Sequence, residues 1–120
     1  MRRLLVIDDH DDIRENIAEI LSLAGYEVFT AGNGKRGVET ALKENPELVI
    51  CDIMMPELDG YGVLHLLRKN DATVNTPFIF LTAKTERTDF RKGMVHGLRD
   101  FVRSVPRQVF LQSIAEHSAA

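Results

Sequence analysis

Short apolar runs alternate with segments of helical periodicity along the whole chain, and this alternation limits the fold more than any other feature. The apolar runs cover residues 4–8, 27–31, 48–52, 78–82 and 100–102. After each run, apolar residues recur at spacings of three and four, as in an amphipathic helix. Five such units in a row predict an α/β protein, with a doubly wound parallel sheet of five strands, right-handed crossovers and five helices on its two faces.

The five expected helices follow the five runs in order. They are marked by Ile17 and Leu21, by Val38 and Ala41, by Val63 and Leu67, by Phe90 and Met94, and by Phe110 and Ile114. Residues 48–52 are apolar on both faces, which is typical of a strand covered by helices on both sides.

Length and composition indicate one ordinary globular domain over residues 1–120. The chain has a single cysteine, Cys51, so neither an internal disulfide nor a cysteine zinc cluster is expected. Its four histidines lack metal-ligand spacing. We interpret His10 as a solvated loop residue, with a position near a ligand crevice as the alternative. Because no apolar run is long enough to cross a membrane and no signal peptide opens the chain, we expect a cytoplasmic protein without membrane contact.

Four carboxylates follow the first apolar run within five positions: Asp8, Asp9, Asp11 and Asp12. Like charges this close repel one another and resist leaving water. In parallel α/β sheets, ligands bind beyond the carboxyl ends of the strands, where Asp8 and Asp52 would both lie. Mg²⁺ prefers such hard oxygen ligands and its charge would offset the repulsion, so we expect a magnesium site there.

Capping of the first helix is the alternative explanation for these acids, since carboxylates favour the positive end of a helix. We favour capping for Asp11 and Asp12, and metal binding for Asp8 and Asp9. A carboxylate beside a metal can also attack a phosphoryl group, and Asp52 is the candidate for this role. Thr82, at the end of the fourth run, could contact a phosphoryl oxygen, although threonine is common in strands for other reasons.

Three motifs together resemble the receiver domain of two-component response regulators, and the resemblance covers nearly the whole chain. They are VIDDHDD at residues 6–12, DIMMPELDG at 52–60 and FLTA at 80–83. The resemblance implies a flavodoxin-like sheet with strand order 2-1-3-4-5, a chemotaxis-regulator-like receiver, and an aspartyl phosphate formed with Mg²⁺. It implies a signalling phosphoprotein that assists its own phosphorylation and dephosphorylation rather than an enzyme.

The resemblance also implies a role for each matching residue. Asp52 matches the phosphoacceptor, Asp8 and Asp9 match the acidic pair that holds Mg²⁺ with Asp52, and Thr82 matches the switch hydroxyl. The remaining matches are Met54, whose backbone carbonyl contacts the metal, Phe101, the aromatic residue that moves with the switch, and Lys84, which with Met54 tunes phosphoryl lifetime. Pro56 and Gly60 shape the loop after Asp52, where a Cβ would hinder the backbone turn.

The sequence departs from the family pattern after the fifth apolar run, where the family has a lysine that pairs with the phosphoryl group. Counting without gaps places Ser104 at that position. A serine can donate a hydrogen bond but carries no charge. Either phosphorylation persists in weaker form, or Arg103 or Lys84 partly substitutes, or the domain is a degenerate receiver. Strand alternation argues against Arg103 unless the strand contains a bulge.

We therefore expect a receiver that a histidine kinase or phosphotransfer protein phosphorylates on Asp52, and that gates binding to an effector protein or a linked output domain. One alternative is a degenerate, phosphate-independent interaction module. A less favoured one is an aspartyl-phosphate phosphatase, because neither Asp8 nor Asp52 is followed by a second acid two residues later.

The segment 84–107 carries a net charge of +4 within a chain of net charge −3. We interpret it as a solvated helix face rather than a nucleic-acid site, since no interleaved aromatic residues support base stacking. Its mixture of Arg87 and Arg91 with Glu86 and Asp89 suggests a homodimer through the surface of helix four, strand five and helix five.

Overall fold

The computed structural model describes residues 2–82 and 102–119, with side chains given as far as 113. It contains one parallel sheet in the order β2-β1-β3-β4-β5, as expected. The strands are β1 (Arg3–Ile7), β2 (Glu27–Ala31), β3 (Leu48–Asp52), β4 (Phe78–Thr82) and β5 (Val102–Pro106). The first four agree closely with the apolar runs of the sequence.

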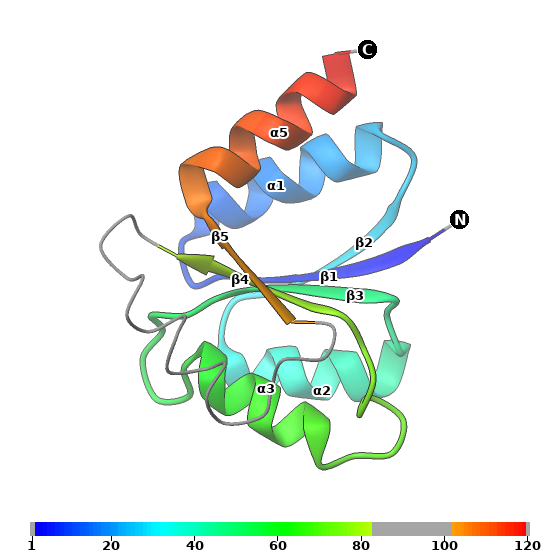
Figure 1. Ribbon diagram of the computed structural model, residues 1–120, viewed down its shortest axis with the longest axis vertical. Coiled ribbons are helices and arrows are strands. Elements are labelled where there is room, and N and C mark those ends of the chain that lie inside the picture. The colour runs from blue at the N-terminus through cyan, green and yellow to red at the C-terminus, as the bar shows by residue number, and fades with distance from the viewer. Residues whose placement is uncertain (1, 83–101, 120) are drawn as a thin grey trace.

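Four helices are described: α1 (Asp11–Leu23), α2 (Gly34–Glu44), α3 (Gly60–Arg68) and α5 (Arg107–Ala119). They form a layer on each face of the sheet, with α1 and α5 on one face and α2 and α3 on the other (Figure 1). The expected helix around Phe90 and Met94 lies outside the described residues. Within residues 2–82 and 102–119, no helix is both long and apolar enough to cross a bilayer.

Two hydrophobic clusters fill the space between the sheet and its helices. One joins Leu5, Ile7 and Phe80 to Ala41 of α2 and Leu64 of α3. The other is a smaller cluster on the opposite face, and it holds α1 and α5 against the sheet through side chains of both helices. Its residues are Leu4, Val6, Ile17, Leu21, Ile50 and Leu81, with Phe110 and Leu111 packed against them. The alternation of side chains along each strand sends successive apolar residues into the two clusters in turn.

The fifth strand differs from the sequence-based expectation. It covers Val102–Pro106 rather than residues 100–102, and α5 begins directly after it at Arg107. β5 is an edge strand of the sheet, which is where a proline can end a strand without removing a hydrogen bond between neighbours. The shift moves Ser104 from just beyond the strand to its middle.

The loop between β3 and α3 is held close to the end of β3. The N–H of Gly60 donates to the carbonyl of Ile53 (2.9 Å), and Asp59 caps α3 by accepting a hydrogen bond from the N–H of Gly62 (2.9 Å). A Cβ at Gly60 would lie 2.6 Å from the carbonyl oxygen of Asp52. Close backbone approach, rather than a left-handed turn, therefore requires the glycine.

Candidate functional site

Two buried carboxylates lie side by side at the carboxyl edge of the sheet. β1 and β3 are adjacent, with Ile7 in register with Cys51, so Asp8 and Asp52 occupy equivalent positions one residue further along. Asp8 is fully buried and Asp52 is 2% exposed. Asp8 is held in line with β1 because its N–H donates to the carbonyl of Ala31 in β2 (3.1 Å).

His10 is exposed at the end of the loop before α1, as interpreted from the sequence, and its imidazole also lies against this pair. Its Nδ1 is 2.9 Å from Asp8 Oδ1, 3.2 Å from Asp9 Oδ1 and 3.6 Å from Asp52 Oδ2. The hydrogen bond to Asp8 is the main cause that raises the pKa of His10, and the charges of Asp8 and Asp9 add to it. A cationic imidazole offsets part of the repulsion among the three carboxylates.

Arg107 supplies a second positive charge from the other side of the cluster. Its Nη2 lies 3.2 Å from Asp52 Oδ1 and 4.0 Å from Asp8 Oδ2. The guanidinium reaches this position because Arg107 is the first residue of α5, and α5 packs beside α1 over the same face of the sheet (Figure 1). Asp52 thus forms an ion pair with a residue 55 positions away in the chain.

The pKa of Asp52 is raised from its ordinary value of 3.8 to about 6. Burial is the largest cause and the negative charge of Asp8 comes next, while Arg107 is the main opposing influence. Asp52 is therefore mostly ionised at pH 7 and above, yet it remains in an environment that favours neutralisation by a cation or a phosphoryl group.

Ser104 does not reach this site. In register, Ser104 pairs with Phe80 and Phe80 with Cys51, whereas Asp52 pairs with Leu81. Residues that are paired across adjacent parallel strands point their side chains to the same face of the sheet, and the next residue along each strand points to the opposite face. Ser104 therefore faces the α2 and α3 layer, where its buried Oγ has no hydrogen-bond partner.

The other predicted residues are placed as follows. Thr82 is buried at the end of β4, one position beyond the partner of Asp52. Met54 lies in the loop after β3 and its side chain is 63% exposed. The predicted contact of its backbone carbonyl with a metal stays a prediction. Lys84 and Phe101 lie outside the described residues. Arg103 donates a long hydrogen bond to the carbonyl of Val102 (3.5 Å).

Asp11 and Asp12 lie in the first turn of α1, where carboxylates favour the positive end of the helix. Asp11 is exposed and pairs with Arg14 (2.7 Å). These positions agree with the helix-dipole part of the interpretation of the two acids, whereas neither acid caps α1, whose N-cap residue is His10 and has no side-chain capping hydrogen bond. Both acids lie outside the cluster of Asp8, Asp9, His10 and Asp52.

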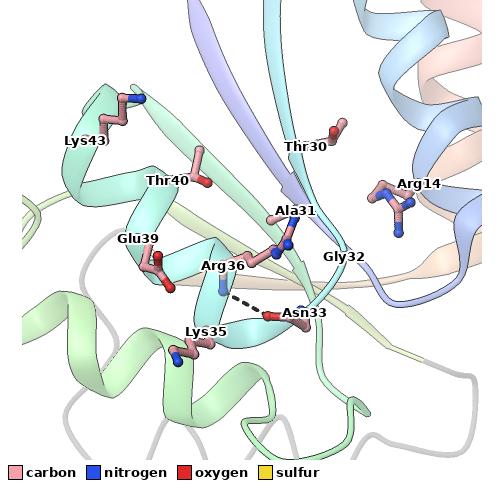
Figure 2. A pocket seen from close by; sticks show the side chains of 10 residues that line it. All are labelled: Arg14, Thr30, Ala31, Gly32, Asn33, Lys35, Arg36, Glu39, Thr40 and Lys43. Carbon is pink, nitrogen blue, oxygen red and sulfur yellow. Dashed lines mark hydrogen bonds between the residues drawn. The ribbon is translucent and has the colours of Figure 1, made fainter.

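A hollow of about 720 Å³ lies beside the acidic cluster, between α1, the end of β2 and α2 (Figure 2). Four cationic side chains, those of Arg14, Lys35, Arg36 and Lys43, and one carboxylate, that of Glu39, line it. Arg14 also joins it to the cluster, because its Nη1 donates to the carbonyl of Asp8 (2.8 Å). This positive surface would attract an anionic group that approaches Asp52.

The carboxylates are suited to a hard divalent cation. One oxygen each of Asp8, Asp9 and Asp52 is buried and accepts no hydrogen bond. Asp8, Asp9, His10 and Asp52 each offer a ligand atom, and these atoms lie within 4.8 Å of one another. Buried carboxylates are stable only when paired or bound to a metal, so the donor set fits Mg²⁺.

Comparison with known proteins identifies the family. Residues 4–112 match the family model of the response regulator receiver domain. This chain belongs to that family. Receiver domains are generally phosphoacceptor domains of two-component signalling systems.

Relatives and solved structures agree with this assignment. This receiver domain is 44% identical to the probable transcriptional regulator ycf27 of Pyropia yezoensis over 100 residues, which cover 83% of this chain and 40% of the relative. It is 38% identical to the transcriptional regulatory protein YrkP of Bacillus subtilis, over 83% of this chain and 42% of that protein. The chain thus spans about two fifths of the length of these relatives.

Among solved structures, chemotaxis protein CheY4 of Vibrio cholerae superposes with a TM-score of 0.81 at 25% identity, over 97% of this chain and 98% of that chain. The N-terminal domain of a receiver protein from Methanoculleus marisnigri superposes with a TM-score of 0.76 at 28% identity, over 98% and 95% of the two chains. The flavodoxin-like strand order implied by the motifs is therefore confirmed.

Sequence reasoning missed two residues of this site. In the sequence, an ungapped count leads to Ser104 and leaves Arg107 only as part of the basic segment 84–107. The strand that continues to Pro106 is the signal that could have redirected it, since the first residue after a parallel strand lies at the ligand edge. For His10, the signal is that it directly follows Asp8 and Asp9, which makes a position near the ligand edge possible, although a solvated loop histidine is the more common case.

Proposed function

We propose that this receiver domain accepts a phosphoryl group on Asp52 from a partner histidine kinase or phosphotransfer protein, with Mg²⁺ held by Asp8, Asp9 and Asp52. One observation carries the proposal. Asp52 is a buried carboxylate at the ligand edge of the sheet, and it is surrounded by two further carboxylates and by the Arg107 guanidinium at 3.2 Å.

In the proposed transfer, an oxygen of Asp52 attacks the phosphorus atom of a phosphohistidine. The new P–O bond forms as the P–N bond breaks, and the electron pair of that bond returns to the imidazole nitrogen of the donor. Such reactions depend mainly on position and on neutralising charge on the phosphoryl oxygens. When bound, Mg²⁺ supplies that charge as a Lewis acid.

The residues of the chain have three tasks in this scheme. The pKa of Asp52, about 6, leaves the carboxylate ionised and nucleophilic at neutral pH. Arg107 places a permanent cation beside Asp52 Oδ1, where the negative charge of a phosphoryl group would arrive. Thr82 ends the neighbouring strand and its hydroxyl would contact a phosphoryl oxygen, as the family resemblance implies.

The output of this step is a change in binding rather than a released product, so we infer a switch and not an enzyme. The phosphoryl group adds charge at the end of β3, and Thr82 transmits its presence to the surface formed by β5 and α5. The downstream partner is an effector protein or a linked output domain. Because the relatives are named as transcriptional regulators, we propose that this output acts on transcription without direct nucleic-acid contact by the receiver domain itself.

The test is intact mass spectrometry after incubation with a small phosphoryl donor and Mg²⁺. We expect one phosphoryl adduct, which is absent without Mg²⁺ and absent in Asp52→Asn. Asp12→Asn is the matched control, because Asp12 is an exposed carboxylate outside the cluster, and it should be phosphorylated normally.

The degenerate, phosphate-independent alternative predicts that the natural sequence forms no phosphoryl adduct. It would be favoured if neither the natural sequence nor Ser104→Lys forms an adduct. An adduct that appears only in Ser104→Lys would show that the missing lysine had disabled the acceptor, and that Arg107 does not replace it.

A further inference from the structure

His10 makes unusual contacts for a residue at the start of a helix. It occupies the N-cap position of α1, yet its side chain makes no capping hydrogen bond. Its Nδ1 instead faces one oxygen from each of three aspartates, Asp8, Asp9 and Asp52, at 2.9, 3.2 and 3.6 Å. The backbone N–H of His10 also donates to Asp8 Oδ1 (2.9 Å), which anchors the residue beside the cluster.

Two of the three oxygens that face Nδ1 lack the hydrogen bonds that buried carboxylates normally have. Asp9 Oδ1 and Asp52 Oδ2 are buried without a hydrogen bond, whereas Asp8 Oδ1 accepts one from the backbone N–H of His10 (2.9 Å). The other oxygen of Asp8, Oδ2, is also buried without a hydrogen bond. Because Asp8 and Asp52 are almost fully buried, a cation is the natural partner for these atoms. The three carboxylates and the imidazole together make a set of four potential metal donors.

The distances within this set are those that a small metal ion requires. Donors about 2.1 Å from a metal lie about 3.4 Å apart in tetrahedral geometry and about 3.0 Å apart in octahedral geometry. The three separations between Nδ1 and the carboxylate oxygens, 2.9 to 3.6 Å, span these values. An ion pair between a protonated His10 and the same carboxylates gives similar distances, so an experiment has to separate the two arrangements.

We propose that Nδ1 of His10 is an additional ligand of this metal site, and that the site therefore takes Zn²⁺ in addition to Mg²⁺. The proposal rests on the metal site of the proposed function and extends it. Mg²⁺ selects oxygen ligands, whereas imidazole favours Zn²⁺ and related transition-metal ions. Ligation requires the neutral imidazole, so Zn²⁺ displaces the proton that Nδ1 shares with the carboxylates.

The test compares the binding of Zn²⁺ and of Mg²⁺ by isothermal titration calorimetry. Loss of a group that merely supports a metal ligand weakens binding about 10–100-fold, so His10→Ala should weaken Zn²⁺ binding at least about tenfold. Binding of Mg²⁺ should not weaken, because Mg²⁺ selects oxygen ligands and the substitution removes a positive charge that competes for them. His65→Ala is the matched control, because His65 is exposed on α3 away from the carboxylates, and it should leave both affinities unchanged.

A second variant and a direct observation guard against misfolding. His10→Gln keeps a polar side chain but lacks the imidazole lone pair, so it should behave as His10→Ala does. In the natural sequence, nitrogen NMR should show a large shift of the His10 ring nitrogen with Zn²⁺ and a small one with Mg²⁺.

Unchanged Zn²⁺ affinity in both His10 variants would overturn the proposal. So would an equal loss of Zn²⁺ and Mg²⁺ affinity, because His10 would then only shape the loop that carries Asp9. These outcomes are independent of the proposed function, which fails only if the natural protein forms no phosphoryl adduct on Asp52 with Mg²⁺.

Discussion

The pKa of Asp52 reflects a balance among burial, two carboxylates and two cations. Burial and the charge of Asp8 raise it, while Arg107 and His10 lower it, and the result is about 6. A carboxyl group whose pKa is higher in the folded protein than in the unfolded chain binds more protons when folded. In the metal-free protein, stability therefore falls as the pH rises from about 4 to about 6.

Asp52→Asn removes this titration and should stabilise the metal-free protein at neutral pH. We expect the free energy of unfolding to rise by about 1–3 kcal/mol near pH 7.5 and to change little near pH 4, where Asp52 is already protonated. Urea unfolding in the presence of EDTA measures both values. A gain of equal size at the two pH values would show that the titration of Asp52 is not the cause of the stabilisation. Asp12→Asn, the control, should show no gain at either pH.

The rate of phosphorylation should depend on Arg107 and not on Ser104. Charge-assisted contacts contribute about 1.5–3 kcal/mol, so Arg107→Gln should slow adduct formation roughly tenfold or more. Arg107→Lys should retain part of the rate because it keeps the charge without the planar fork. The time course of the intact-mass experiment measures these rates.

Ser104→Lys is the discriminating variant, because Ser104 faces the other side of the sheet from Asp52. It should not accelerate phosphorylation in the natural background. A clear acceleration, together with a normal rate in Arg107→Gln, would mean that the lysine position of the family is Ser104 after all.

At the scale of elements, the site depends on how strands end and helices begin. β3 ends at Asp52, and α3 begins eight residues later at Gly60. The backbone at Gly60 lies so close to the carbonyl of Asp52 that only hydrogen fits between them. The acceptor therefore depends on a connection whose geometry a single methyl group would disturb.

Gly60→Ala should destabilise the protein, because the new Cβ meets backbone atoms that cannot rotate away. Overpacking of this kind costs about 1–3 kcal/mol. Urea unfolding should show the loss, and phosphorylation should slow as Asp52 is displaced. Gly32→Ala is the control, since its nearest neighbour is the flexible guanidinium of Arg14 at 3.2 Å. Equal effects of the two substitutions would argue against backbone contact as the cause.

The ends of some strands can be predicted from the local sequence pattern, and the end of β5 cannot. The ends of β3 and β4 at Asp52 and Thr82 agree with the apolar runs, because the burial of both strand faces leaves a clear sequence signal. The predicted end of the fifth strand, at residue 102, was wrong, because the polar residues Arg103 and Ser104 end the apolar run while the strand itself continues. The edge position of β5, which only pairing with β4 establishes, lets the strand continue to Pro106.

At the scale of the whole molecule, the packing of α5 beside α1 decides which residue meets Asp52. Phe110 and Leu111 of α5 pack against the cluster that contains Ile17 and Leu21 of α1. This contact fixes the start of α5 over the carboxyl edge of the sheet. Arg107 therefore links Asp52 directly to α5, and we propose that a phosphoryl group on Asp52 would act through this contact on the surface proposed for partner binding.

The predicted homodimer through the surface of helix four, β5 and α5 belongs to this scale. We expect sedimentation velocity to show a larger dimer fraction with a phosphoryl mimic and Mg²⁺ than without them. Arg103 is exposed on β5, so Arg103→Glu should reduce that fraction through altered charge. A monomer under both conditions would rule out this mode of association.

The sequence by itself determined the fold class, the strand order through the family motifs, and the grouping of Asp8, Asp9 and Asp52 as candidate site residues. These depend on periodicity and on short motifs, which are local and survive in a linear pattern. The tertiary structure alone decided that Arg107 contacts Asp52 and that His10 faces three carboxylates. Such contacts depend on where an edge strand ends and how a helix packs, and no spacing along the chain encodes either.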